Sequence, residues 1–201
     1  MNRVVVTGIG MINALGNDAK SSFKAICEGK TGVKKITLFD PSDFPVQIAA
    51  EISDFNPESV VDPKDVKKLD RFIVLGHVAA DEAIKDCGLS EFDPDEFGIS
   101  SAAGIGGLPN IEKNSNICLE RGPRRISPFF VPSALVNMLG GVISIKHNLK
   151  GPNVASVTAC AAGTHAIIEA AKTIMVGEAR AMLVVGAEST ICPVGIGGFA
   201  A

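Results

Sequence analysis

The sequence predicts an α/β protein built around a mainly parallel sheet. Strand-like and helix-like segments alternate along the 201 residues, and this order is typical of parallel strands joined by right-handed crossovers. Hydrophobic residues make up 46% of the chain, although no uncharged apolar stretch reaches the roughly 20 residues of a membrane-spanning helix. We therefore expect a soluble protein that does not enter membranes, with strands that helices bury on both faces.

The first predicted elements are two strands and a helix. Three consecutive valines within residues 3–8 predict a buried first strand, since the run is too short and too interrupted by glycine for a secretory signal. Residues 21–28 predict a short helix that begins at Ser21 or Ser22, because serine is a good N-terminal cap. Residues 46–52 predict a second strand.

The middle of the chain predicts three helices and one strand. Apolar residues at helical spacing extend over residues 63–87, and Gly88 ends this helix. Residues 97–102 form the next expected strand, and two further helices are expected over residues 109–119 and 132–147.

The last third predicts a strand, a helix and a strand, over residues 154–158, 161–176 and 181–185. The helix is apolar nearly all round apart from Glu169 and Lys172, which predicts burial between two layers. The sequence then ends in an apolar, glycine-rich stretch over residues 193–201 with no polar tail. We therefore expect a chain cut from a longer one.

Charge and cysteine content exclude several classes of site. The net charge of −3 and the pI near 5.6 argue against general nucleic-acid binding, which needs a broad basic surface. The five cysteines are scattered and none forms a CxxC pair, so neither a disulfide framework nor a zinc site is predicted. We expect no metal, no cofactor and a location in the reducing cytoplasm.

Two glycine motifs resemble nucleotide-binding loops but fail at a required position. After the first strand, Asn13 stands where GxGxxG needs its third glycine. A Gly-Lys-Thr run at residues 29–31 resembles the end of a phosphate-binding loop, yet Lys24 occupies the position of the first glycine. The run Gly104–Gly107 either lets a ligand approach the backbone or is only a flexible turn.

Cys160 is the candidate nucleophile. It lies between a predicted strand and a predicted helix, within small residues that let the backbone turn sharply and let a carbonyl group approach. Free N–H groups at a helix start favour thiolate over thiol and can hold an oxyanion. The alternative is a buried, inert cysteine, which is the commoner role of an isolated one.

No histidine is placed by the sequence to activate this cysteine. His165 follows Cys160 by five residues, so on a helix it points about 100° or more away from the cysteine. A packed helix histidine is therefore the favoured interpretation. His77 and His147 lie on other predicted helices, and the nucleophile is expected to lack a visible base.

Six short motifs carry a resemblance to a known family. They are Arg3–Gly10, Gly104–Leu108, Gly122–Pro132, Gly151–Asn153, Thr158–Cys160 and Gly195–Phe199. In this order they resemble the N-terminal half of a bacterial β-ketoacyl-[acyl-carrier-protein] synthase, type II. The motifs cover nearly the whole chain, so the resemblance is specific.

The resemblance implies a thiolase-like fold, in which two similar α/β halves stack as five layers, α/β/α/β/α, around mixed, mainly parallel sheets. Residues 1–201 would form the N-terminal ketoacyl synthase domain, and the C-terminal half would be absent. A homodimer is also implied, paired through the strand at residues 154–159.

The implied activity is that of an acyltransferase in fatty-acid elongation. Cys160 would take the acyl chain from acyl carrier protein as a thioester, and its backbone N–H would be one oxyanion donor. Two histidines of the absent half would promote decarboxylation of malonyl carrier protein. The 201-residue chain alone is therefore expected not to condense.

The resemblance also assigns an acyl pocket. Ile105, Phe130, Gly195 and Phe199 match positions that line or border it, where apolar walls reward burial of the acyl chain by about 0.8 kcal/mol per methylene. Plain core packing is the alternative for Ile105 and the two phenylalanines.

A basic patch completes the implied site. Its members match residues that dock the acidic acyl carrier protein, and they are Lys64, Lys67, Lys68, Arg124 and Arg125. Docking should weaken as salt rises. Without the resemblance, the three lysines would be interpreted as the solvated face of a helix.

Two other functions stay open. A coenzyme A-dependent thiolase shares the fold, but the run Gly122–Phe130 and the setting of the cysteine resemble the synthases. A non-catalytic half-chain that assembles with a partner is the alternative from another class.

Overall fold

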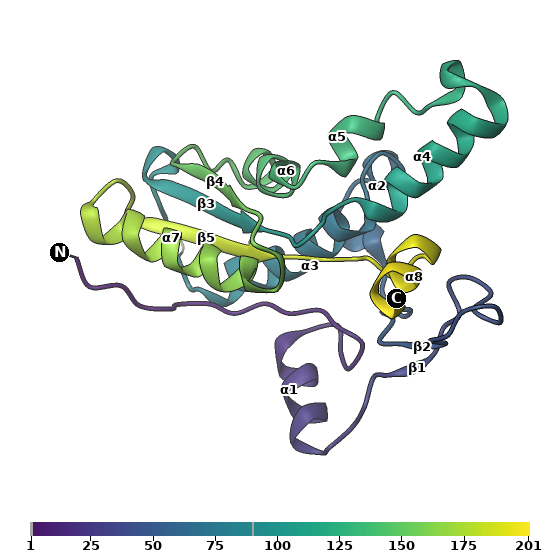
Figure 1. The fold of residues 1–201 in the computed structure, drawn as a ribbon. Helices are drawn as coiled ribbons and strands as arrows, with labels where there is room; N and C mark the ends of the chain where they lie inside the picture. The colour runs from purple at the N-terminus through teal and green to yellow at the C-terminus, as the bar shows by residue number, and fades with distance from the viewer. Residues whose placement is uncertain (1, 90) are drawn as a thin grey trace.

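The computed structural model describes residues 2–89 and 91–201, and its centre is a three-layer α/β/α sandwich (Figure 1). A sheet with the strand order β4-β3-β5 lies between helices α3 and α6 on one face and helix α7 on the other. The strands are β3 (Phe97–Ala102), β4 (Asn153–Ser156) and β5 (Ala181–Gly186). The helices are α3 (Arg71–Asp86), α6 (Asn137–His147) and α7 (Ala162–Val176). The predicted α/β class is confirmed.

The central sheet is parallel, as the alternation of elements predicted. Strand β3 pairs with both neighbours, and Ala102 at its end lies opposite Ser156 of β4 and Gly186 of β5. All six residues of β3 are buried, because helices cover both faces. The carboxyl ends of the three strands therefore meet at one edge of the sheet.

The main hydrophobic core lies between the sheet and the helices α3 and α6. Phe72 of α3, Leu139 and Ile143 of α6 and Ile99 of β3 are fully buried there. The two helices approach closely at Gly76, where a Cβ atom would lie 2.4 Å from Leu139 Cδ1. This core fixes both helices on the sheet.

Two predicted long helices are interrupted in the structure. The first divides into α2 (Pro63–Val66) and α3, because Asp70 accepts the Phe72 N–H at 3.2 Å and so caps α3. The second divides into α5 (Phe130–Ala134) and α6, because Leu135 adopts an extended conformation between them. In both places a local backbone break overrides continuous apolar spacing.

The remaining elements connect and flank the sandwich. They are α1 (Ala19–Cys27), β1 (Lys34–Lys35), β2 (Ile48–Ala49), α4 (Leu108–Arg121), α8 (Pro193–Ala200) and the 3₁₀ turns η1 (Pro57–Ser59), η2 (Pro94–Glu96), η3 (Pro123–Arg125) and η4 (Ala159–Ala161). Strands β1 and β2 pair in a separate antiparallel sheet, so the expected strand at residues 46–52 is much shorter. Helix α1 is capped by Asp18, which accepts the Ser21 N–H at 2.7 Å, and not by Ser21 or Ser22. Over residues 2–89 and 91–201, no helix combines the length and apolarity needed to cross a membrane.

The prediction of a buried strand at residues 3–8 is wrong. This segment is extended but pairs with no strand in the described part of the chain, and Val6 is 81% exposed. The backbone beyond it bonds to helix side chains instead: the Ile9 N–H donates to Asp86 Oδ2 at 2.9 Å. A strand needs a backbone partner, and Figure 1 shows the segment running alone beside the sandwich.

Helix α7 is buried on one face, not nearly all round as expected. Ala162, Ala166 and Ala170 are buried on the sheet side, whereas Ile167 is 57% exposed and Ile168 is also exposed. The apolar outer face of α7 has no covering layer in the described chain. The chain accordingly provides three of the five layers that the resemblance implies.

Candidate active site

Cys160 lies in the tight turn η4, between the end of β4 and the start of α7. The side chain is exposed, so the alternative of a buried, inert cysteine is wrong for this chain. Ala159, directly before it, has a φ of +50°, which is uncommon for a residue other than glycine and is typical of functional turns. The turn η4 satisfies the first N–H groups of this segment: the Ala161 N–H donates to the Thr158 carbonyl oxygen at 3.1 Å, and the Ala162 N–H donates to that of Ala159. The Cys160 N–H donates to no acceptor in the described part of the chain, so it remains available to an anion.

A glycine loop approaches this turn from the neighbouring strand. The loop Gly104–Gly107 follows β3, and a Cβ atom on Gly104 would lie 3.7 Å from the Ala159 Cα. Gly106 has a φ of +85°, a conformation that glycine adopts without strain. The structure therefore brings Ile105, which is 42% exposed, close to the turn that carries Cys160.

Glu188 holds the glycine loop in place, and sequence reasoning missed it. Its Oε2 atom accepts the N–H groups of Gly104 and Ile105 at 2.8 Å each, and its Oε1 atom accepts the Gly106 N–H at 3.2 Å. A polar residue just past the carboxyl end of a parallel strand was the available signal, because ligand sites gather at that edge.

The other proposed acyl-pocket residues lie around α4. Asn110 Nδ2 donates to the carbonyl oxygen of Phe130 at 3.3 Å. Gly195 is buried in α8, a helix that packs against α4. Phe199, near the end of α8, is 77% exposed. The contacts described thus link Ile105 to the Cys160 turn, and Phe130 and Gly195 to α4.

His165 is engaged by its own neighbourhood. Its Nδ1 atom lies 3.3 Å from Thr158 Oγ1, and its Nε2 atom lies 3.6 Å from Glu169 Oε1. These contacts agree with a packed helix histidine. The remaining histidines, His77 on α3 and His147 on α6, lie on the opposite side of the sheet from α7.

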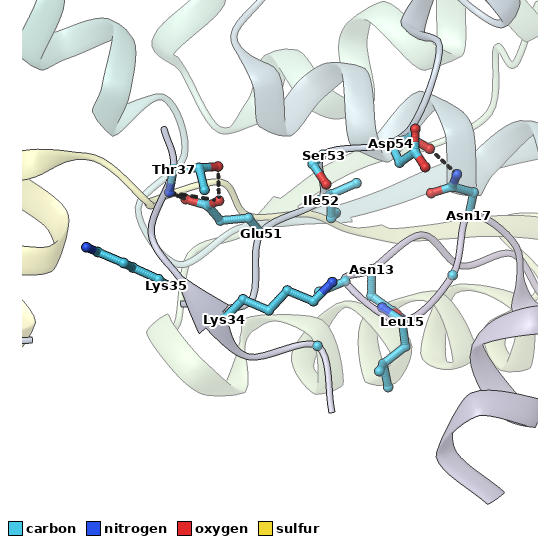
Figure 2. A pocket seen from close by; sticks show the side chains of 13 residues that line it. Asn13, Leu15, Asn17, Lys34, Lys35, Thr37, Glu51, Ile52, Ser53 and Asp54 are labelled. Carbon is cyan, nitrogen blue, oxygen red and sulfur yellow. Dashed lines mark hydrogen bonds between the residues drawn. The ribbon is translucent and has the colours of Figure 1, made fainter. Parts of the chain in front are cut away.

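A separate polar hollow lies away from the cysteine (Figure 2). Its volume is about 360 Å³, and its lining comes from residues 13–17, 32, 34, 35, 37 and 51–54, without Cys160. Glu51 accepts hydrogen bonds from the backbone and hydroxyl of Thr37. Burial acts to raise the pKa of Glu51, but these bonds outweigh it and the pKa lies below its usual value. So polar a hollow does not suit an acyl chain.

The predicted basic patch comes from two segments that touch. Lys68 Nζ pairs with Asp65 Oδ1 at 2.8 Å and lies 5.5 Å from the centroid of the Phe129 ring. This contact joins the end of α2 to the segment that carries Arg124 and Arg125. The exposed members of the patch are Lys64, Lys67, Arg124 and Arg125.

The basic surface extends to an arginine that sequence reasoning missed. Arg121, at the end of α4, lines a shallow hollow together with Arg125 and Ile117.

For metals, the described residues contain no group of three or more His, Cys, Asp or Glu side chains arranged to hold an ion.

Comparison with known proteins identifies the family. The family described as "Beta-ketoacyl synthase, N-terminal domain" matches residues 1–201. The chain is 48% identical over 201 residues to 3-oxoacyl-[acyl-carrier-protein] synthase 2 of Coxiella burnetii, and 44% identical to the protein of that name from Vibrio harveyi. These alignments cover 99% of this chain but 49% and 48% of the relatives.

Solved structures give the same fold. One is a type II polyketide synthase acyl-carrier protein in complex with its ketosynthase bound to the hexaketide, with a TM-score of 0.82 and 25% identity over 97% of this chain and 52% of that one. Another is a β-ketoacyl synthase from Burkholderia phymatum, with a TM-score of 0.76 and 24% identity over 89% of this chain and 45% of that one.

The fold and the matches define the class of the chain as one half of a thiolase-like ketosynthase fold. The chain belongs to the β-ketoacyl synthase family, of which it represents the N-terminal domain. It spans about half the length of the curated relatives that it matches.

Proposed function

We propose that this chain carries the nucleophile of a β-ketoacyl-[acyl-carrier-protein] synthase II. In the complete enzyme, an acyl thioester would condense with malonyl carrier protein to lengthen a fatty acid. The observation that carries the proposal is the exposed Cys160 in the turn η4, directly before α7. The names of the relatives, 3-oxoacyl-[acyl-carrier-protein] synthase 2, support the same reaction.

The first half-reaction follows from the geometry of the turn. The Cys160 sulfur attacks the thioester carbonyl of the acyl carrier protein, and the negative charge moves to the carbonyl oxygen. The Cys160 N–H stabilises this oxyanion, since it is a preorganised donor at the positive end of the α7 dipole. The carrier protein leaves as a thiol, and the acyl chain remains on the cysteine.

The second half-reaction needs groups that the resemblance places outside these residues. Malonyl carrier protein loses carbon dioxide, the resulting enolate attacks the acyl-cysteine, and the sulfur departs from the β-ketoacyl product. Two histidines of the complementary half promote this step. The chain by itself thus accepts an acyl group but does not condense.

The acyl chain would pass beside the glycine loop. Ile105 supplies an apolar side chain next to the Cys160 turn, and Phe130, Gly195 and Phe199 form the apolar border around α4 and α8. Their burial of methylene groups favours longer chains by about 0.8 kcal/mol for each group.

The carrier protein would dock on the basic patch. Exposed cations suit an acidic partner, even on a protein with a net charge of −3. The ketosynthase structure solved with an acyl-carrier protein supports a partner of this kind. The proposed location is the cytoplasm.

A homodimer through β4 is proposed as well. Strand β4 is at the edge of the sheet and exposes Val154, so its outer backbone is free to pair across a two-fold axis. The exposed outer face of α7 offers further apolar surface. These surfaces equally suit the second candidate function, a half-chain that only assembles with a partner.

Mass spectrometry after incubation with acyl carrier protein thioester tests the proposed function. We expect one acyl group on Cys160 in the wild-type protein and none in Cys160→Ser. Loading from carrier protein in preference to coenzyme A separates a synthase from a thiolase. Absence of any adduct in folded wild-type protein would rule out the nucleophile and leave the assembly role.

A further inference from the structure

The register of the sheet places one carboxylate beside the glycine loop. Ala102 of β3 pairs with Gly186 of β5, so Gly104 and Glu188, each two residues further, leave the sheet side by side. The loop backbone presents N–H groups at this edge. The neighbouring strand therefore delivers an acceptor directly to them.

Three N–H donors of the loop converge on the carboxylate of Glu188. Gly104 and Ile105 share Oε2 at 2.8 Å, and Gly106 donates to Oε1 at 3.2 Å. The Ser189 N–H also donates to Oε1, at 3.3 Å. A carboxylate has acceptors on both branches and no donor, so it can accept all four bonds. A glutamine in its place has one oxygen and would turn its amide NH₂ toward at least one loop N–H.

The helix that follows the loop is held by a second carboxylate. Asp70 Oδ2 accepts the N–H of Asn110, in the first turn of α4, at 3.2 Å, and Asp70 is buried at the start of α3. The loop thus lies between Glu188 and an anchored helix start, with Ile105 as its exposed apolar side chain. Its glycine end packs against the turn of Cys160, where a Cβ atom on Gly104 would come within 3.7 Å of Ala159.

From these contacts we propose that Glu188 is a positioning residue for the acyl chain. It fixes the conformation of residues 104–106, and the fixed loop sets how Ile105 meets an acyl chain that approaches Cys160. The role rests on the function proposed above, because it concerns the loading of the same cysteine. Glu188 itself does not react.

The experiment compares Glu188→Gln and Glu188→Ala with wild type and with Glu178→Gln. Glu178 is an exposed glutamate that precedes β5, at the opposite edge of the sheet, so its variant changes the charge equally without touching the loop. Hydrogen exchange of the amides at residues 104–106 measures how firmly Glu188 holds the loop. Acylation of Cys160 by octanoyl and palmitoyl carrier protein measures chain selection, and alkylation by iodoacetamide measures access to the sulfur.

We expect amide exchange at residues 104–106 to become at least tenfold faster in Glu188→Gln. The ratio of octanoyl to palmitoyl acylation rates should change at least fivefold, while iodoacetamide alkylation changes less than twofold. Glu178→Gln should match wild type in all three. Glu188→Gln keeps one acceptor oxygen and so tests the role even where Glu188→Ala is poorly folded.

Exchange rates equal to wild type in Glu188→Gln would overturn the claim that Glu188 fixes the loop. Faster exchange with an unchanged acylation ratio would overturn the link to the acyl chain. Wild-type protein that is not acylated at all would refute the proposed function, and with it this role. Even then, amide exchange in Glu188→Gln shows whether Glu188 holds the loop, so failure of the proposed function and failure of this contact can be told apart.

Discussion

Single residues differ in how far the sequence determined their setting. The placement of Cys160 was predicted from the order of an apolar strand-like run, a turn of small residues and a helix-like run, and its exposed turn agrees. Glu188 was not predicted, because its role depends on a register between strands that are 84 residues apart in sequence, a long-range contact that local patterns do not encode.

His77 gives a prediction at the scale of one residue. Its side chain is buried at 2% exposure, and neither ring nitrogen has a hydrogen-bond partner among the described residues. Burial and the nearby Lys146 charge lower the pKa of His77 to about 4, although Asp81 acts to raise it. Folding thus favours the neutral ring.

The pH dependence of stability follows from this shift. In the unfolded chain the ring takes up a proton as pH falls below 6.5, whereas in the folded protein it does so only near pH 4. Stability should therefore fall as pH drops from 6.5 to about 4, by up to about 3 kcal/mol. Asp81, whose pKa lies below its usual value because bonds from His147 and Lys146 outweigh burial, titrates below this window.

Urea unfolding at several pH values measures this effect. We expect His77→Leu to remove most of the slope between pH 6.5 and about 4. His165→Gln, which changes a partly exposed histidine of α7, should keep it. A slope that is the same in wild type and His77→Leu would contradict the assignment.

At the scale of elements, the periodicity of apolar residues predicted which helices and strands exist better than it predicted where each begins and ends. The strands at residues 97–102 and 181–185 and the helix at 161–176 lie where the apolar patterns placed them, because their partners are in this chain. The segment at residues 3–8 has the same apolar pattern, but its backbone pairs with no strand in the part of the chain that the structure describes. Apolar pattern reports the tendency to be buried, and the partner decides whether a strand forms.

The contact between α3 and α6 gives an element-scale prediction. A side chain at Gly76 would overlap Leu139, since even a Cβ atom would come within 2.4 Å of its Cδ1. We expect Gly76→Val to lower the free energy of unfolding by about 1–3 kcal/mol through overpacking. Chemical denaturation measures the loss. Gly198→Ala, in α8, has no atom within 4 Å of the added Cβ, so it should not lower stability and should raise it by up to about 1 kcal/mol through helix propensity.

For the whole molecule, the prediction concerns how its surface charge affects binding of the carrier protein. The protein carries a net charge of −3, yet Lys64, Lys67, Arg124 and Arg125 are exposed together near Lys68. A local cationic surface attracts an acidic partner most strongly when salt is low, because added salt screens the attraction between exposed charges.

Reversing one charge of this patch should weaken carrier-protein binding. We expect Arg125→Glu to raise the Kd about tenfold, or about 1.4 kcal/mol, with a smaller difference at about 0.5 M salt than at about 0.05 M. Lys20→Glu, which reverses an exposed lysine on α1, is the matched control. Fluorescence anisotropy with labelled carrier protein measures both. Equal losses in the two variants would show that net charge, not the patch, governs binding.

The valine segment at residues 3–8 pairs with no strand in the described part of the chain, and this affects how the protein associates in solution. Its backbone N–H and C=O groups and its bare apolar side chains offer a template on which another extended peptide can add as a strand. Concentrated samples should form oligomers that disperse on dilution or when a matching peptide is supplied. Preparations of the isolated chain are therefore best handled dilute, or produced together with the complementary half.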